Sequence, residues 1–407
     1  MRKLINIGIL MILITSSCVE PIDISAEVDN GENIETIMVV EATLTNELKQ
    51  HEVLLGKGRS FANDSLQLVT QNAEVSITGT NGSAFPFSEI EPGRYLSDES
   101  FQALPNIGYQ LNIQTTEGSS YTSELVFLPE NANITALYAE RIINDLGIEG
   151  IAIYTDSELA PGAAPFLRYQ YEETYKIIAP LWSSFDMVVI DPDPPFTVDS
   201  FDLDPKEQEK RVCYGTQRSN RIIQALDLNR SENEVRRNLV RFISRDEFII
   251  SHRYSILVRQ LVQSPDAYSF YRTLEEQAGN ESVFTEIQPG FIEGNISNMS
   301  NPSEKTLGYF ELANASQERI FFDYEDFFSG EDLPPYAVNC SFLGAPPIVT
   351  PAGTSPLKDA IDSGFFVYVR DNEGEVALPA GPYLTARRAC GDCTVLGSNI
   401  IPEFWIE

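Results

Sequence analysis

Histidine is nearly absent from this chain of 407 residues, which has only His51 and His252. Serine and cysteine hydrolases commonly take their general base from histidine, so an enzyme of that kind would depend on one of these two residues. The shortage also excludes a metal site built from several histidines. His51 stands in a polar stretch that predicts a surface position, and His252 has no evident nucleophile beside it. We therefore expect no catalytic residue.

Basic residues are also scarce, because 28 Lys and Arg face 60 Asp and Glu, for a formal charge of −32. Such a chain repels phosphate backbones, which excludes nucleic acid as the default partner. Apolar residues make up 43% of the chain, enough for packed cores. The length exceeds that of one ordinary core, which stops growing at about 250 residues, so we expect two domains.

Long apolar runs are missing after the first residues of the chain. Arg2 and Lys3 precede an apolar stretch over residues 4–14, which is typical of a signal peptide and too short to span about 30 Å of hydrocarbon. The small residues before Cys18 resemble a bacterial lipobox, although Thr15 stands where that motif usually has leucine. We expect Cys18 to carry lipid, which would anchor the protein without a transmembrane helix.

Residues 1–17 are therefore predicted to be a signal peptide, and residues 18–35 a lipidated acidic tether with six acids and no base. Acidic stretches of this kind resemble the signals that send some lipoproteins to the cell surface, with a plain spacer as the alternative. We expect a protein that is lipid-anchored in the outer membrane and faces the cell surface.

The remaining chain predicts a mostly β fold. Residues 36–130 alternate in short runs separated by Gly turns, which predicts a prealbumin-like or immunoglobulin-like β-sandwich. Residues 131–407 predict a larger β-rich domain, with strands over residues 254–262, 306–312 and 318–322. One clear helix is expected at about 264–278, because Ser264, Pro265 and Asp266 form a helix start.

Cysteine is limited to four residues besides Cys18: Cys213, Cys340, Cys390 and Cys393. An even number in an exported protein predicts two disulfides, with three possible pairings. Four thiolates binding zinc and a redox pair at Cys390 and Cys393 are the alternatives. Two disulfides would fasten the C-terminal tail to the segments near residues 213 and 340.

Residues 179–210 form a proline-rich, acidic insert in which aromatic side chains are interleaved. These aromatic residues are Trp182, Phe185, Phe196 and Phe201. The insert shows no strand period, and long segments of this kind are often functional, so we expect these residues to contact a ligand or partner. We also expect deletion of about residues 182–201 to spare the fold. Residues 327–356 form a second segment in which aromatic residues are interleaved with prolines. The alternative is that the aromatic side chains fold back onto the domain.

Several segments together resemble the domain of unknown function 4249 family, whose members are outer-membrane lipoproteins. The segments are RYSILVRQ at 253–260, AY at 267–268, GNISN at 294–298, LGYF at 307–310 and CGDCT at 390–394, followed by Pro402, Phe404 and Trp405. In the family motif Gly294, Asn295 and Asn298, we expect either a left-handed turn closed by the Asn298 side chain or a loop that faces a ligand.

The resemblance implies no known reaction. It implies an accessory lipoprotein beside a TonB-dependent transporter, acting in nutrient uptake or in outer-membrane assembly, without catalysis and without a cofactor or metal. That transporter is the expected protein partner, and a glycan or a peptide is the expected ligand class. The alternative is a cell-surface hydrolase, a glycosidase or peptidase, that uses a carboxylate pair among the 60 acids.

Overall fold

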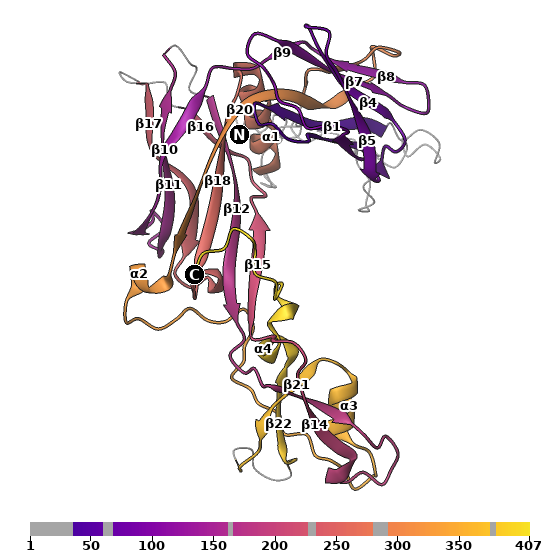
Figure 1. Ribbon diagram of the computed structural model, residues 1–407, viewed down its shortest axis with the longest axis vertical. Coiled ribbons are helices and arrows are strands. Elements are labelled where there is room, and N and C mark those ends of the chain that lie inside the picture. Colours follow the sequence, from indigo (N-terminus) through magenta and orange to yellow (C-terminus); the bar gives the residue numbers. More distant parts are fainter. Residues whose placement is uncertain (1–35, 60–67, 162–165, 227–232, 280–291, 375–379) are drawn as a thin grey trace, which may run out of the picture.

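The computed structural model of the protein describes residues 36–59, 68–161, 166–226, 233–279, 292–374 and 380–407 (Figure 1). Within these residues the protein is mostly β, as the sequence predicts, and it has four α-helices, of which the sequence predicted the first. The signal peptide, Cys18 and the acidic tether lie outside the described residues. We distinguish an N-terminal, a central and a distal unit.

The N-terminal unit is built from nine strands that enclose one core. They are β1 (Thr36–Thr45), β2 (Glu52–Arg59), β3 (Leu68–Val69), β4 (Glu74–Gly79), β5 (Ala84–Glu91), β6 (Arg94–Ser97), β7 (Gly108–Gln114), β8 (Ser120–Ser123) and β9 (Val126–Phe127). Alternate residues point inward, so Val75 and Ile77 of β4 are buried beside Ile113 and Leu111 of β7. The period-2 pattern therefore determines which face of these strands is buried.

The central unit packs two sheets face to face. One sheet contains β10 (Ala132–Ile143), β11 (Glu149–Leu159) and β17 (Glu234–Ser244). The other contains β12 (Phe166–Ile178), β15 (Val212–Arg218), β16 (Ile223–Leu226) and β18 (Tyr254–Val262). Ile151 and Ile153 of the first sheet and Ile256 and Val258 of the second lie in one buried cluster, which is the core between the sheets.

β20 (Thr306–Phe322) joins these two units, because it is one strand of 17 residues where the sequence predicted two. Its first half runs parallel to β1, and its second half runs antiparallel to β18. Residues 313–317, between the two predicted strands, are alanine and polar residues, so no apolar alternation showed that the strand continues. The Ala315 N–H donates to the Asn46 side chain at 2.7 Å. Fifteen strands of the described residues consequently share one hydrogen-bonded sheet.

α1 (Pro265–Gly279) begins as the sequence predicts, because the Ser264 hydroxyl accepts a hydrogen bond from the Ala267 N–H at 3.2 Å. Phe270 and Leu274 lie one turn apart on one helix face. Phe270 and Tyr271 pack against Tyr309 of β20. α1 therefore covers the first half of β20 at the place where the N-terminal and central units meet (Figure 1).

Candidate functional site

The aromatic insert belongs to the distal unit, which projects from the far end of the central unit (Figure 1). This unit contains the antiparallel pair β13 (Phe185–Val189) and β14 (Phe201–Pro205). The same unit contains α3 (Pro356–Asp362) and a second pair, β21 (Phe366–Asp371) and β22 (Tyr383–Arg387).

The prediction that residues 179–210 contain no strand is wrong. Met187 and Phe201 point inward and form a small core with Leu357 of α3. The acidic residues Asp186 and Asp204 face each other on the outer side of the hairpin. Each strand has only five residues, and the prolines and acidic residues around them obscured the alternation of inward and outward side chains.

The four aromatic residues predicted as contacts lie in three different environments. Trp182 is half-buried against the core of the central unit, and Phe201 is buried in the distal core with 6% of its surface exposed. Phe196 is half-buried, and Phe185 is 40% exposed. Burial removes Phe201 from the predicted contact residues, because no partner can reach its ring.

The distal unit carries other exposed apolar side chains that the sequence did not single out. We call the complete set the distal apolar residues: Phe185, Ile190, Val198, Phe342, Val349, Phe365 and Phe366. Phe342 and Phe365 are 78% and 74% exposed. Large aromatic side chains this exposed cost solvation free energy in an isolated protein, so they mark this unit as a candidate interaction surface.

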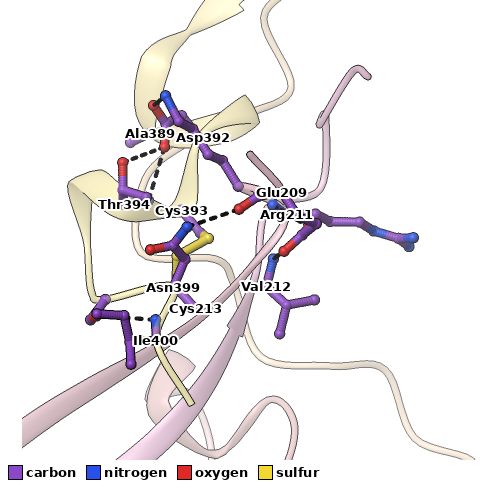
Figure 2. The surroundings of a disulfide bond; sticks show 12 residues. Glu209, Arg211, Val212, Cys213, Ala389, Asp392, Cys393, Thr394, Asn399 and Ile400 are labelled. Atoms are coloured by element: carbon purple, nitrogen blue, oxygen red, sulfur yellow. Dashed lines mark hydrogen bonds and ion pairs between the residues drawn. A yellow bond between two sulfur atoms is a disulfide. The ribbon is translucent and has the colours of Figure 1, made fainter. Parts of the chain in front are cut away.

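Two disulfides fasten the distal unit at its base, which confirms that prediction. Cys213 is bonded to Cys393, and Cys340 is bonded to Cys390. Cys390 and Cys393 thus have different partners, so they do not form a redox pair with each other. Cys213 and Cys393 lie in the core of the central unit, which ties the returning tail directly to β15 (Figure 2).

Asp392 organises the tail between the two disulfides. Its carboxylate accepts a hydrogen bond from the Thr394 N–H at 3.0 Å (Figure 2). It also accepts one from Nε of Arg388 at 3.1 Å. Burial raises the pKa of this carboxyl, but the hydrogen bonds from Thr394 and Arg388 outweigh burial and hold the pKa below its ordinary value. The charged carboxylate therefore fixes α4 (Arg388–Gly391) and the turn that follows it.

Both histidines lie in surroundings that favour the neutral ring. His51 is 2% exposed, so the prediction of a surface position is wrong. Its Nε2 lies 3.0 Å from the carbonyl oxygen of Phe101, and its ring packs edge-on against the Phe101 ring. Burial lowers the pKa of His51 to about 4. The pKa of His252 is also lowered, mainly by burial and to a smaller extent by the positive charge of Lys176.

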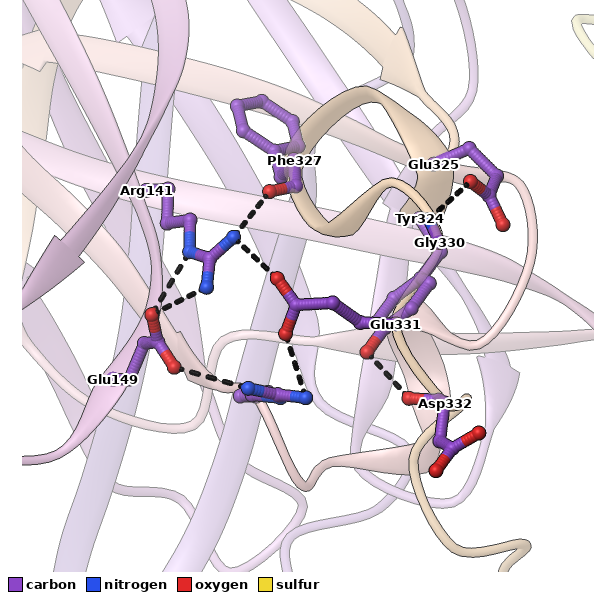
Figure 3. Close-up of polar contacts among 9 residues, drawn as sticks. Arg141, Glu149, Tyr324, Glu325, Phe327, Gly330, Glu331 and Asp332 are labelled. Atoms are coloured by element: carbon purple, nitrogen blue, oxygen red, sulfur yellow. Dashed lines mark hydrogen bonds and ion pairs between the residues drawn. The ribbon is translucent and has the colours of Figure 1, made fainter.

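Four charged residues form a closed ring at the end of the central unit (Figure 3). Arg141 and Arg245 each bridge Glu149 and Glu331, at N–O distances from 2.6 to 3.2 Å. The two guanidinium groups lie over the Phe328 ring, which α2 (Tyr324–Phe328) buries. Because each charge has two partners of opposite sign, the ring attaches α2 to β10 and β11. Phe328 is thus folded back onto the domain, as the alternative for residues 327–356 stated.

Comparison with known proteins supplies the family. The model of the family described as Domain of unknown function (DUF4249) matches residues 20–319. The chain belongs to this family. The matched span ends within β20, so β21 and β22 of the distal unit lie beyond the part that defines DUF4249.

No curated protein matches this DUF4249 chain. Among solved structures, a DUF4785 family protein from Legionella pneumophila is 9% identical with a TM-score of 0.18, over 54% of this chain and 50% of that one. The chain thus spans about half the length of the Legionella protein. The B domain of a biofilm-associated protein is 9% identical with a TM-score of 0.13, over 74% of this chain and 92% of that one. Neither likeness carries an argument about function.

The family motif residues Gly294, Asn295 and Asn298 have structural partners. The side chain of Asn295 accepts the N–H of Phe310 at 2.8 Å and donates to its carbonyl oxygen at 2.9 Å, as a neighbouring strand would. A Cβ on Gly294 would lie 1.6 Å from the carbonyl oxygen of Gly308, so only glycine fits. Gly294 and Asn295 do not adopt positive φ, so the left-handed turn expected there is wrong.

Asn298 does close a turn with its side chain, as that same expectation stated. Its Oδ1 accepts the N–H groups of Ser300 and Asn301, and its Nδ2 donates to Glu304 at 2.8 Å. Asn298 is the last residue of β19 (Ile296–Asn298), which pairs with β8. The motif therefore attaches residues 294–298 to the N-terminal unit. The side chains of Asn295 and Asn298 form their hydrogen bonds with other residues of the fold.

Two features are absent from the residues that the structure describes. No group of three or more His, Cys, Asp or Glu side chains there is placed to hold a metal ion. In the same part of the chain, no helix combines the length and apolar character that a membrane span requires.

Proposed function

We propose that the protein is a non-catalytic binding lipoprotein of the outer membrane, anchored by lipid on Cys18, that serves a TonB-dependent transporter. The distal apolar residues carry this proposal. Seven exposed apolar side chains, four of them phenylalanine, gather on one small projecting unit. Exposed aromatic residues supply most of the binding energy in typical protein interfaces, so this unit is the contact with the transporter.

The way the distal unit is mounted supports the same role. Two disulfides and the Asp392 hydrogen bonds hold its base. A surface that is already ordered loses little conformational entropy when it binds. β1, which begins at residue 36, belongs to the N-terminal unit, and this unit and the distal unit lie at opposite ends of the described structure (Figure 1). A body tethered through the residues before β1 can therefore present the distal unit to a partner.

The test is affinity purification of the tagged protein from solubilised outer membrane, with the co-purifying chains identified by mass spectrometry. We expect the wild-type protein to retain a TonB-dependent transporter and the F342S/F365S double variant to lose it. Both residues are highly exposed, so the variant should fold normally. The matched control is L48S/L146S, which removes two exposed leucines from the N-terminal and central units and should retain the transporter.

Failure of the wild-type protein to retain a transporter, or equal retention by F342S/F365S, would contradict the proposal. The Cys18→Ser variant tests the anchor in the same preparation, because it should leave the membrane fraction after a high-salt wash. The hydrolase alternative stays an untested prediction. A glycan or peptide recovered unchanged after incubation with the purified protein would favour binding over hydrolysis.

A further inference from the structure

A cavity of about 450 Å³ opens beneath α1, where the N-terminal and central units meet. β18 ends at Val262, and α1 then covers the part of β20 that β18 no longer reaches. The rings of Phe270, Tyr271 and Tyr309 form one wall. The centroid of the Phe270 ring lies 5.4 Å from that of Tyr271 and 5.2 Å from that of Tyr309. Leu274 and Leu307 extend the apolar lining. We call this the aromatic cavity.

The base of the aromatic cavity is electrically compensated. Arg168 is paired with the buried carboxylate of Glu311, and its guanidinium lies 4.2 Å from the Tyr271 ring centroid. Glu311 also accepts a hydrogen bond from Gln263 at 2.7 Å. Because Arg168 and Glu311 satisfy each other, a charged ligand group would gain no unpaired counter-charge at this base and would lose its hydration. Glu41 and Arg221, the other charged residues of the lining, are exposed, so solvent screens their charges. The aromatic cavity therefore suits an uncharged, flat, apolar ring.

A second cavity of about 590 Å³ adjoins the first and has a different lining. We call it the polar cavity, and its polar side chains are Gln217, Asn220, Gln224, Arg218, Arg221, Arg241, Glu173 and Glu275. Arg241 lies 3.2 Å from Glu173, and Arg218 lies 3.2 Å from Glu172, so opposite charges largely compensate each other. Amide side chains both donate and accept, as hydroxyl and amide groups of a ligand do.

The two cavities share an edge. Asn220, Arg221 and Ile222, in the loop between β15 and β16, line both of them. α1 also contributes to both, with Leu274 in the aromatic cavity and Glu275 in the polar cavity. Each volume falls in the range of small-molecule sites, about 300–1,000 Å³, and junctions between units are common places for such sites.

We propose that these adjoining cavities bind one uncharged amphipathic small molecule. Its flat apolar ring occupies the aromatic cavity, and a hydroxyl-rich or amide-rich group crosses the shared edge into the polar cavity. This ligand site goes beyond the proposed function, because it lies away from the distal apolar residues and its test does not require the transporter.

The test is isothermal titration calorimetry of the purified protein with the phenyl β-glycosides of glucose, galactose and N-acetylglucosamine. These probes join an uncharged aromatic ring to a hydroxyl-rich group. We expect at least one to bind at least 10-fold more tightly than the methyl glycoside of the same sugar and than phenol. Absence of binding by all three phenyl glycosides would overturn the proposal.

Two variants test the location. Leu274→Trp fills the aromatic cavity and should weaken the bound phenyl glycoside at least 10-fold, whereas Thr273→Trp, one position along α1 on its exposed side, should not. Asn220→Leu changes an exposed residue of the shared edge and should weaken the phenyl glycoside but not phenol. Unchanged glycoside binding in Leu274→Trp, with its melting temperature preserved, would overturn the site. Leu274→Trp should still retain the transporter, which separates this test from that of the proposed function.

Discussion

His51 shows at the scale of one residue how burial sets the response of this protein to pH. Its Nε2 is satisfied by the carbonyl oxygen of Phe101, while Nδ1 has no hydrogen-bond partner among the described residues. Protonation would place a charge and an unpaired donor inside the N-terminal unit. The folded protein therefore keeps His51 neutral, which is why burial lowers its pKa to about 4.

We predict that this histidine makes the protein less stable in mild acid. As the pH falls below about 6.5, His51 of the unfolded chain binds a proton, whereas His51 of the folded protein binds one only near its pKa of about 4. The free energy of unfolding therefore falls between these two pH values. The loss approaches about 3 kcal/mol at the acidic end. Urea unfolding of wild type and His51→Gln at pH 7 and pH 4.5 measures it.

Many carboxylates also titrate in this range, so the comparison between the two proteins isolates the histidine. His51→Gln should lose less unfolding free energy than wild type between pH 7 and pH 4.5. An identical loss in both proteins would show that His51 has no part in the acid response.

At the scale of elements, the β13–β14 hairpin is the framework of the distal unit. The sequence suggested that residues 182–201 could be deleted without harm. The structure indicates the opposite, because Met187 and Phe201 supply the hairpin's side of the core that Leu357 completes. Phe185, at the start of β13, is 40% exposed, so the same hairpin provides both stability and contact surface.

We predict that Phe201→Ala destabilises the distal unit by about 3–5 kcal/mol, as expected for a buried phenylalanine. Phe185→Ala, the matched change on the opposite strand, should cost less than about 1 kcal/mol because the ring is 40% exposed. Hydrogen exchange of the β21 and β22 amides under native conditions reports the stability of this unit. Equal protection in the two variants would show that the hairpin is not part of its core.

At the scale of the whole molecule, the two disulfides connect parts of the chain that are far apart in sequence. Cys213 and Cys393 are separated by 180 residues, and Cys340 and Cys390 by 50. The first bond joins the tail to the central unit, and the second closes a loop that contains α3 and β21. The two bonds together hold the base of the distal unit to the central unit and to the C-terminal tail.

We predict that the two bonds contribute unequally to stability. In the chain-entropy model the longer loop is worth about 5 kcal/mol and the shorter one about 4 kcal/mol. C213A/C393A should therefore lower the guanidinium midpoint more than C340A/C390A, and its cavity in the central core adds to the loss. A larger effect of C340A/C390A would contradict this order. Thiol titration of the denatured, unreduced wild type should find none of these four cysteines free.

The sequence by itself determined the features that local patterns encode. The alternation of β4 and β7 specified their buried faces, Ser264 and Pro265 specified the start of α1, and the even number of cysteines indicated two disulfides. These features depend on neighbours within one turn or one strand, or on composition alone. The matching DUF4249 segments were also visible, because a family resemblance is read from the order of residues.

Only the tertiary structure decided which distant segments meet. The cysteine pairing, the continuity of β20 across two units, the burial of His51 and the core role of Phe201 all depend on contacts between residues far apart in the chain. The cavities beneath α1 have the same origin, since Arg168, Phe270 and Tyr309 come from three separate elements. A local pattern specifies which side of an element is apolar, whereas long-range packing selects the surface that covers it.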